Sequence, residues 1–419
     1  MARKDVAIIS VGYNGRFVSK RPDVSIPELI EPAVRDALRK TKLTINDIDA
    51  IAMGNMQTFE GVNSPHLWAS DYIGGTGKPV IRIATGGTTG MSTFQSAYYH
   101  VASGLYDVVM AIAWEKQDEG DSQVGLGGIL MPEVFAMFQF GPDLSEGRGL
   151  GIGVGSGGGG GSTGSASFQA MSYLARSGGG IEHIDMIAAL LRSNAAKNPY
   201  AHLQVPGCKP EDIAKTPIIS FPLRFGHTCP TSCGAHVLIL ASKEKAKKYA
   251  MTDRVAWVKG VACGTSDATF GNLIDGQITD PAEQVVATMV AKKAYARAGI
   301  ADPQKEIQMA EVYDGFAHQD LMWPERLLLV GDGKSPEMVA KGAYNIEGDM
   351  PINPSGGVLS TNAIGASAMV RVGEAALQVM GLAEGGHQVP RRVRNAVAHG
   401  WGGLFQFVTV TVLGEAPVQ

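Results

Sequence analysis

Short apolar runs and longer amphipathic stripes follow one another along this chain, and they predict an alternation of strands and helices. An apolar run that ends in glycine or in a polar cluster is typical of a buried strand, whereas apolar residues that repeat about every 3.6 positions are typical of an amphipathic helix. In the first half, these patterns predict strands at residues 6–12, 48–53, 80–84 and 108–114 and helices at residues 26–40 and 92–103. Strands that alternate with helices favour parallel pairing and an α/β fold.

The same order of elements returns in the second half of the chain. Strands are predicted at residues 255–262, 308–313 and 405–413, and helices at residues 283–297 and 364–380. A glycine-rich turn precedes one helix in each half, at residues 86–90 and 353–357. Two further helices, at residues 168–177 and 184–198, are predicted in the stretch between the halves. The repeated order predicts an internal duplication with an inserted segment.

The composition narrows the classes of partner and compartment. The chain has 419 residues, of which 45% are hydrophobic and only 18% are charged, and its net charge is −4. Scattered Lys and Arg residues with a small net charge argue against nucleic acid or an anionic membrane as a partner. No apolar run approaches the ~20 residues of a membrane helix, and the four cysteines are too few to staple a chain of this length. We therefore expect a cytoplasmic protein with reduced thiols and with part of its surface covered by other subunits.

The two glycine-rich turns suggest how a duplicated fold would form a site. A glycine pair before a helix brings backbone N–H groups close to a ligand, and the start of a helix favours negative charge. If both turns face one centre, their helix starts are expected to stabilise the oxygen of an enolate or of a tetrahedral intermediate. Residues 157–161 form a further glycine run, but no Gly-Lys-Ser/Thr follows it, so a surface loop is favoured over a phosphate-binding loop.

Several stretches resemble motifs of the thiolase superfamily, in particular its sterol-carrier-type subgroup, whose members commonly pair with a small OB-fold subunit. They extend over nearly the whole chain and comprise residues 81–104, 114–116, 194–200, 221–242, 311–316 and 353–367. The resemblance implies a thiolase fold, which is a duplicated five-layer αβαβα arrangement with an inserted loop domain. It places the N-terminal half at residues 1–250, with the loop domain at about 115–215, and the C-terminal half at residues 251–419.

The resemblance does not extend to the usual catalytic side chains. Gly87 occupies the position of the family's nucleophilic cysteine, Asn362 that of its catalytic histidine, and Tyr313 that of the histidine or asparagine of the oxyanion motif. Only His399, at the last acid/base position, has a side chain that titrates near neutral pH. A covalent acyl-cysteine cycle at the usual position is excluded, because glycine has no side chain.

These positions are compatible first with an unusual thiolysis. Coenzyme A would attack the keto group of a bulky β-oxoacyl-CoA directly, with His399 as the base. Asn362 and backbone amides near Gly87 would hold the oxyanion. Residues 54–60 and 84–90 resemble the large subunits of benzoylsuccinyl-CoA thiolases, which supports this function.

Two other functions remain open. One is retro-aldol cleavage of an acyl-CoA, as in the steroid side-chain-cleaving members of the superfamily. Those enzymes share the glycine and the tyrosine that correspond to Gly87 and Tyr313, but their second catalytic tyrosine corresponds to Ala363 here. The other is a non-catalytic subunit that binds an acyl-CoA or supports a partner.

The substrate contacts are predicted from the turns and from two further histidines. Thr88 and Gly357 lie in the glycine-rich turns, and His66 and His318 are candidates for lining the substrate tunnel and for protonating a leaving group. A packed, structural histidine is the alternative for each of the latter two. Aromatic side chains that would shape an acyl pocket, or that would pack in the core, are Phe138, Phe140 and Trp323.

Metal, cofactor and partner expectations complete the picture. His227, Cys229 and Cys233 resemble metal ligands, but a fourth ligand is missing, so no metal is expected. Either cysteine is a conceivable relocated nucleophile, although a buried inert thiol is favoured. The resemblance implies no bound cofactor, coenzyme A as a co-substrate, and a homodimeric core with a small subunit that carries an OB-fold and a zinc ribbon.

Overall fold

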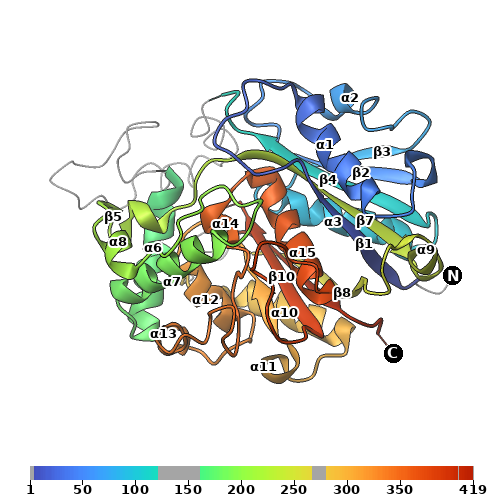
Figure 1. Ribbon diagram of the computed structural model, residues 1–419. Coiled ribbons are helices and arrows are strands. Elements are labelled where there is room, and N and C mark those ends of the chain that lie inside the picture. The colour runs from blue at the N-terminus through green and yellow to red at the C-terminus, as the bar shows by residue number, and fades with distance from the viewer. Residues whose placement is uncertain (1–3, 121–160, 267–279, 404, 419) are drawn as a thin grey trace, which may run out of the picture.

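The computed structural model describes residues 4–120, 161–266, 280–403 and 405–418, which form a nine-stranded mixed sheet with helices on both faces (Figure 1). Its strands are β1 (Val6–Tyr13), β2 (Ala50–Gly54), β3 (Val80–Ile83), β4 (Val108–Lys116), β7 (Cys233–Ser242), β8 (Ala256–Thr265), β9 (Met309–Glu311), β10 (Asn395–Gly402) and β11 (Phe407–Gly414). The longer helices are α1 (Ile26–Arg39), α3 (Thr89–Ala102), α6 (Gly161–Ser177), α7 (Ile181–Ala195), α10 (Val285–Ala298), α12 (Gln319–Arg326) and α15 (Ile364–Met380).

Shorter elements connect these. They are α2 (His66–Ala69), α8 (Pro210–Ala214), α9 (Lys243–Tyr249), α11 (Pro303–Glu306), α13 (Ser335–Ala340) and α14 (Gly357–Ser360), the 3₁₀ turns η1 (Ile45–Asp47) and η2 (Phe225–His227), and a two-stranded sheet of β5 (Ile218–Ser220) and β6 (Leu223–Arg224).

The strand order confirms the predicted duplication. The order is β3-β2-β4-β7-β1-β8-β11-β10-β9, so the second half mirrors the first across the β1–β8 pair. In both halves one parallel pair, β2–β4 or β9–β10, is followed by two antiparallel pairs. Strand β3 has a reduced counterpart, a single parallel bridge between Ile352 and Ala310, immediately before the second glycine-rich turn.

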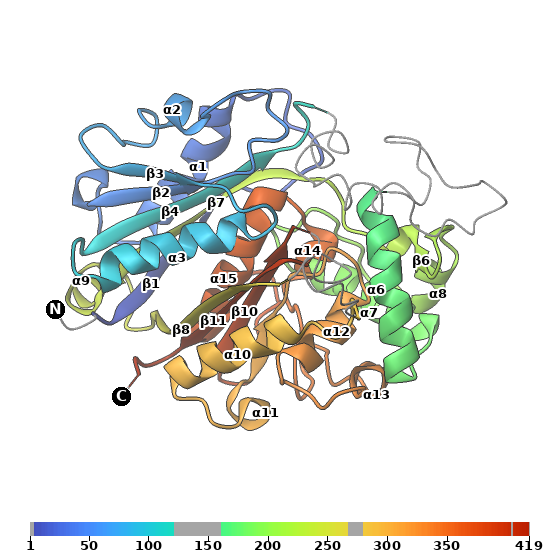
Figure 2. The same cartoon turned by 180° about the vertical axis from the view of Figure 1, so that it is seen from behind.

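The buried residues explain how these elements stack into layers. Helices α3 and α15 lie side by side between the two halves of the sheet, with α1 outside one half and α10 outside the other (Figure 2). One hydrophobic cluster fills the central layer, and two more lie beneath the outer helices. Phe94 of α3 and Met369 of α15 belong to the central cluster, whereas Leu29 of α1 and Val290 of α10 belong to the outer ones.

The strands predicted above include neither β7 nor β10, and β10 is the one without a continuous apolar run. Its sequence contains a histidine and two glycines, which weaken the strand signal. The neighbours supply what the local sequence lacks, because β10 pairs with β9 on one side and with β11 on the other. The last predicted strand, residues 405–413, corresponds to β11, which is the counterpart of β7 and not of β4.

The inserted segment lies between β4 and β7 and contains α6, α7, α8, β5 and β6. Helix α6 begins seven residues before its predicted start, because residues 161–167 are small and carry no periodic apolar pattern. The boundary predicted at residue 250 falls between α9 and β8 and remains a prediction. Phe138, Phe140 and residues 157–160 of the glycine run lie outside the described residues. No helix in the described ranges is both long and apolar enough to cross a membrane.

A buried ion pair fixes the loop that follows α15. His387 Nε2 lies 2.9 Å from Glu374 Oε2, and both side chains are almost fully inaccessible. The hydroxyl of Tyr13 donates to the other carboxylate oxygen of Glu374 at 2.6 Å. Burial opposes the charged form of His387, but the charge of Glu374 and the hydrogen bond between His387 and Glu374 raise the pKa of His387, and the partners of Glu374 lower the pKa of that carboxyl to about 2. Folding therefore favours the charged form of both partners.

We expect His387→Gln to lower the free energy of unfolding by about 3 kcal/mol at pH 6, because it leaves Glu374 buried without its counter-charge. Since the pKa of His387 is raised by folding, its contribution is fully present below the unfolded value and is lost as the pH rises through the folded value. The difference between the two proteins should thus shrink at alkaline pH in denaturant titrations. The control His100→Gln, on α3, should change stability by less than about 0.5 kcal/mol; an equal loss in both variants would contradict the role of the pair.

Candidate active site

Hydrogen bonds through Tyr313 join three of the four residues predicted to be catalytic, Tyr313, Asn362 and His399, while Gly87 packs against β10. Gly87 precedes α3, Tyr313 follows β9, Asn362 precedes α15, and His399 lies in β10. Tyr313 is at the centre of the group. Its backbone contacts β10, and its side chain reaches the segment before α15.

Three hydrogen bonds define the position of Tyr313. Its carbonyl oxygen accepts from Trp401 Nε1 at 2.9 Å, its backbone N–H donates to His399 Nδ1 at 3.4 Å, and its hydroxyl donates to Asn362 Oδ1 at 3.4 Å. The ring is buried, and burial raises the pKa of the phenol. Tyr313 is therefore a neutral hydrogen-bond donor, and its long bond to Asn362 is one that a ligand oxygen can replace.

The amide of Asn362 has a defined orientation. Ser367 Oγ donates to Asn362 Oδ1 at 2.9 Å, and Asn362 Nδ2 donates to the sulfur of Cys229 at 3.2 Å. The hydroxyl donors fix the oxygen on one side, which directs the NH₂ group to the other. A primary amide has two N–H donors, so the bond to sulfur leaves the second for a ligand.

The backbone of Asn362 is held as firmly as its side chain. Its N–H donates to Ser232 Oγ at 3.1 Å, and its carbonyl oxygen accepts from Ser232 N at 3.0 Å and from Gln117 Nε2 at 3.1 Å. The backbone of Asn362 is thus hydrogen-bonded both to the segment before β7 and to the residue that follows β4.

Gly87 lies where backbone packs against backbone. A Cβ atom added to Gly87 would lie 2.7 Å from the carbonyl oxygen of Trp401 and 3.2 Å from the Cα of Gly402. Thr88 is buried next to it, and its hydroxyl donates to the carbonyl oxygen of Thr85 at 2.7 Å. The usual nucleophile is therefore absent, and the space that its side chain would need is occupied by β10.

His399 occupies the other face of β10. Ala398 and Gly400 face α15, and alternation along the strand turns the intervening side chain towards α12. There the imidazole packs against Trp323, with ring centroids 4.5 Å apart. Burial lowers the pKa of His399 to about 3, so the ring is neutral. Because its Nδ1 accepts from Tyr313, its proton is on Nε2, which favours a supporting role over the predicted role as base.

The second glycine-rich turn does not offer a free helix start. Gly357 has a φ of +67°, and the N–H groups of Val358 and Leu359 donate to the two carboxylate oxygens of Asp314, at 2.6 and 3.1 Å. The expectation that both helix starts bind the substrate oxygen therefore does not hold for α14, because an internal carboxylate already occupies it. Substrate binding by Gly357 is disfavoured for the same reason.

The two histidines predicted to contact substrate have other neighbours. His318 is fully buried, its Nε2 is 3.0 Å from Gln169 Oε1 of α6, and burial lowers its pKa to about 3. His66 starts α2 and is half-buried, and its pKa is lowered by burial and by the charge of Arg82. Neither histidine has a hydrogen bond to the group around Tyr313 in the parts of the chain that are described.

The residues that resemble metal ligands point in different directions. His227 Nε2 is 2.7 Å from Asp185 Oδ1, Cys233 Sγ is 3.0 Å from Asp118 Oδ1, and Cys229 contacts Asn362. The described ranges contain no group of three or more His, Cys, Asp or Glu residues that is suited to a metal ion. Cys229 instead belongs to the candidate site, a contact between distant segments that its sequence context did not reveal.

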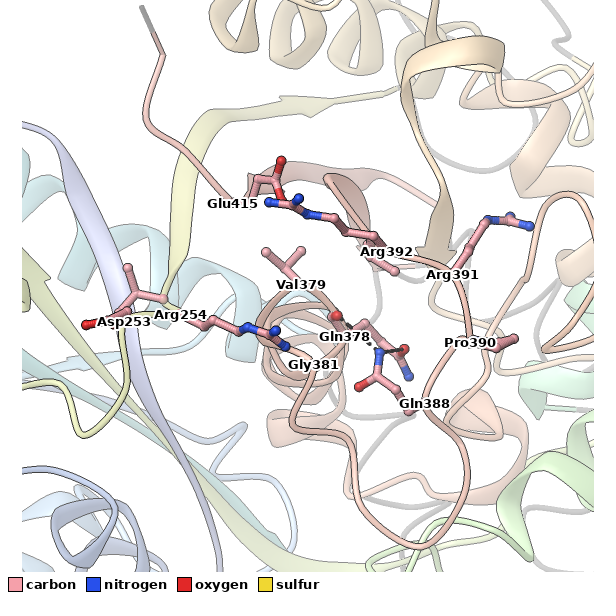
Figure 3. A pocket seen from close by; sticks show the side chains of 12 residues that line it. Asp253, Arg254, Gln378, Val379, Gly381, Gln388, Pro390, Arg391, Arg392 and Glu415 are labelled. Atoms are coloured by element: carbon pink, nitrogen blue, oxygen red, sulfur yellow. Dashed lines mark hydrogen bonds and ion pairs between the residues drawn. The ribbon is translucent and has the colours of Figure 1, made fainter.

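Two cavities lie away from this group of residues. One, of about 530 Å³, lies at the C-terminal end of α15 and is lined by Arg254, Gln378 and Glu415 among others (Figure 3). Arg392 there is 2.6 Å from Glu415, so this guanidinium already has a partner. The other, of about 570 Å³, lies beside Tyr13. A 17-residue helix is ~25 Å long at 1.5 Å per residue, so the first cavity is remote from Asn362.

Comparison with known proteins supports the inferred family. Residues 274–415 match the model of the thiolase C-terminal domain-like family. The chain is 28% identical to an acetyl-CoA acetyltransferase of Methanocaldococcus jannaschii over 378 residues, which are 88% of each protein. It is 25% identical to the 17-hydroxy-3-oxo-4-pregnene-20-carboxyl-CoA lyase of Mycobacterium tuberculosis over 393 residues, 93% of this chain and 92% of the lyase.

The fold is also similar to that of solved structures. A solved structure of an Ltp2-ChsH2(DUF35) aldolase superposes with a TM-score of 0.77 at 22% identity, over 99% of this chain and 98% of that one. The duplicated topology, the central pair of helices and the similarity to relatives along nearly the full length all indicate the same fold. The chain therefore has the thiolase fold, and residues 274–415 are similar to the thiolase C-terminal domain-like family.

Proposed function

We propose that this chain cleaves a carbon–carbon bond of a β-oxoacyl-CoA by direct attack of coenzyme A, without an acyl-cysteine intermediate. The observation that carries the proposal is the oriented pair of neutral donors, Tyr313 and Asn362, in the place where the family has its acid/base groups. The relatives include an acetyl-CoA acetyltransferase and an acyl-CoA lyase, which both act on acyl-CoA thioesters by their names. The closed space beside Gly87 removes the covalent alternative at the usual position.

The bond changes can be followed atom by atom. The sulfur of the coenzyme A thiolate bonds to the β-carbonyl carbon, and the bond between the α- and β-carbons then breaks. Its electron pair forms the enolate of the remaining thioester, which takes a proton at the α-carbon. The products are two acyl-CoA molecules. The developing charge is on the thioester oxygen, and the hydroxyl of Tyr313 and the second N–H of Asn362 are the donors that stabilise it.

The thiol proton has to leave before attack. His399 faces α12 and carries its proton on Nε2, so we assign it the support of the Tyr313 backbone. Coenzyme A then supplies its own thiolate, since a free alkyl thiol with a pKa of about 8.5 is ionised to a few per cent at pH 7. The surrounding neutral donors favour this form of catalysis, because they stabilise charge without changing protonation state.

Retro-aldol cleavage is the second candidate, and Tyr313 is the observation that favours it. A β-hydroxyacyl-CoA would lose its hydroxyl proton, form a carbonyl group and release the same thioester enolate. The same two donors would therefore serve both reactions. Ala363, next to Asn362, is buried and has no polar side chain. Tyr313 would therefore have to act without a second tyrosine at that position.

The finer features of the proposal follow from the resemblance. They are a bulky substrate of the benzoylsuccinyl-CoA type, a homodimeric core, and a small OB-fold and zinc-ribbon subunit. The aldolase to which the fold is similar is itself a complex with a second protein, by its name, which supports a partner for this chain. A non-catalytic, acyl-CoA-binding role is what remains if no cleavage occurs with the partner present.

Product analysis separates the two reactions. Direct thiolysis requires added coenzyme A, yields two acyl-CoA products, and should accelerate about tenfold per pH unit up to the thiol pKa of about 8.5. Mass spectrometry of the products and the pH dependence of kcat/KM for coenzyme A measure both features. An aldehyde or ketone formed without coenzyme A would reject thiolysis and support the aldol reaction.

Tyr313→Phe should lower kcat by a factor of about 100 to 1,000, the usual effect of removing one oxyanion donor, without a comparable change in KM. Tyr295→Phe is the matched control, because Tyr295 is also buried and its hydroxyl donates at 2.6 Å to the carbonyl oxygen of Leu327. That variant should lose stability but retain kcat. Equal turnover in both variants would remove Tyr313 from the site.

Gly87→Cys should not create an acyl-enzyme. The new Cβ would lie 2.7 Å from the carbonyl oxygen of Trp401, so we expect a loss of about 1–3 kcal/mol in unfolding free energy and a lower rate. Gly331→Cys is the control, since its Cβ would meet only Cγ of the Lys334 side chain, at 3.2 Å, and no backbone atom. Intact-mass detection of an acyl adduct on Gly87→Cys with full activity would contradict the closed geometry.

A further inference from the structure

Two sequence motifs meet at the start of α15 and have no role in the mechanism so far. One is residues 54–60, which follow from the end of β2, and the other is residues 114–116, at the end of β4. Their polar side chains turn inwards. Glu115 is fully buried and Glu60 nearly so, and both lie beside the first turn of α15.

Glu115 acts as a distant cap for that helix. Its Oε2 accepts from the backbone N–H of Met56 at 3.1 Å and from the N–H of Gly365, the second residue of α15. A Cβ on Gly365 would lie 2.1 Å from this oxygen, so the approach needs glycine. A carboxyl group from another strand thereby satisfies the start of the helix that follows Asn362.

Glu60 completes a carboxyl pair. Its Oε1 accepts from Asn55 Nδ2 at 2.9 Å, and Asn55 Oδ1 accepts from Arg82 Nε at 3.0 Å. Glu60 Oε2 and Glu115 Oε1 are both buried and have no other partner in the described part of the chain, and the two carboxyl groups interact with each other. Two adjacent buried carboxyls are stable together when one of them carries a proton that it donates to the other.

Gln117 holds the same segment from the other side. Gln117 lies two residues after Glu115, just past the end of β4, so alternation turns both side chains to the same side. Its Nε2 donates at 3.1 Å to the carbonyl oxygen of Asn362. Glu115 thus fixes the residue three positions after Asn362, while Gln117 fixes Asn362 itself. The end of β4 holds the segment at two points.

We propose that Glu115 and Gln117 are positioning residues that set the amide of Asn362, and that a proton held between Glu60 and Glu115 keeps this arrangement closed. The inference rests on the proposed function, in which Asn362 stabilises the thioester enolate. An amide displaced by about 1 Å from the enolate oxygen would lose on the order of 100-fold in rate.

The carboxyl pair also makes the position of Asn362, and with it the rate, depend on pH. Burial raises the pKa of both groups, and the charge of Glu60 raises that of Glu115 further. The other titratable or charged groups facing the pair are Arg82, which interacts with both carboxyls, and His66, which faces Arg82. When the shared proton leaves at alkaline pH, two like charges face each other, so Glu115 is expected to withdraw from Gly365 and the rate to fall.

The test compares two substitutions in the full chain with any partner subunit present. Glu115→Ala should lower kcat by about 100-fold with little change in KM. Glu115→Gln keeps an acceptor for Gly365 and a donor for Glu60, so kcat should stay within a few-fold of the parent while the alkaline decline of kcat disappears. Glu244→Ala, at an exposed position of α9, is the control and should retain both rate and pH profile.

Two further measurements keep the result independent of the proposed reaction. The infrared spectrum should contain a protonated buried carboxyl band at neutral pH that is absent from Glu115→Gln, and a crystal structure of Glu115→Ala should contain a displaced Asn362 amide. Loss of activity in Asn362→Ala but not in Glu115→Ala would overturn the positioning role. Full activity in Asn362→Ala would instead reject the proposed function, while the infrared band would still decide whether the proton is shared.

Discussion

Backbone packs directly against backbone where the two halves of this molecule meet, and the candidate site depends on that contact. A Cβ on Gly87 would lie 2.7 Å from the carbonyl oxygen of Trp401, and one on Gly90 would lie 2.6 Å from the backbone nitrogen of Met369. Glycine alone allows α3 to approach β10 and α15 so closely. Because α3 belongs to one half and α15 to the other, this contact joins the duplicated units, and it places Gly87 against Trp401, whose indole N–H donates to the carbonyl oxygen of Tyr313.

The two side-chain donors of the candidate site, the Tyr313 hydroxyl and the Asn362 amide, are polar but uncharged. The buried ion pairs Arg371–Glu311 and His387–Glu374 involve the later turns of α15, whereas the side chain of Asn362, before its start, contacts hydroxyls and a thiol. Neutral donors act on a developing oxyanion without having to change protonation state, which suits a reaction whose hardest step is the release of an enolate. A low dielectric environment strengthens each of these hydrogen bonds.

The sequence predicts the architecture better than the roles of single residues. Strands such as β1 and β4, and helix α15, follow from apolar patterns that their own burial imposes, and α15 was predicted with its observed bounds. The pattern missed β10, so alternation along that strand could not be used to place the ring of His399, which packs against Trp323. Glu115 and Gln117 act through contacts to residues about 250 positions away, and no local pattern encodes a contact of that range.

The two reactions proposed for this chain, cleavage by a thiol and cleavage of an aldol, release the same thioester enolate, so one site would serve either. Only the bond made at the β-carbon differs between the two reactions, whereas the thioester oxygen collects the same charge in each. In the proposed function, Tyr313 and Asn362 stabilise this charge, so the site binds the leaving enolate and makes no demand on the attacking group. Because Gly87 has no side chain, the chain lacks the nucleophile of a covalent thiolase cycle at that position. In the proposed function, the reaction is then decided by the group at the β-carbon, which is either the thiol of coenzyme A attacking a keto group or a hydroxyl group of the substrate.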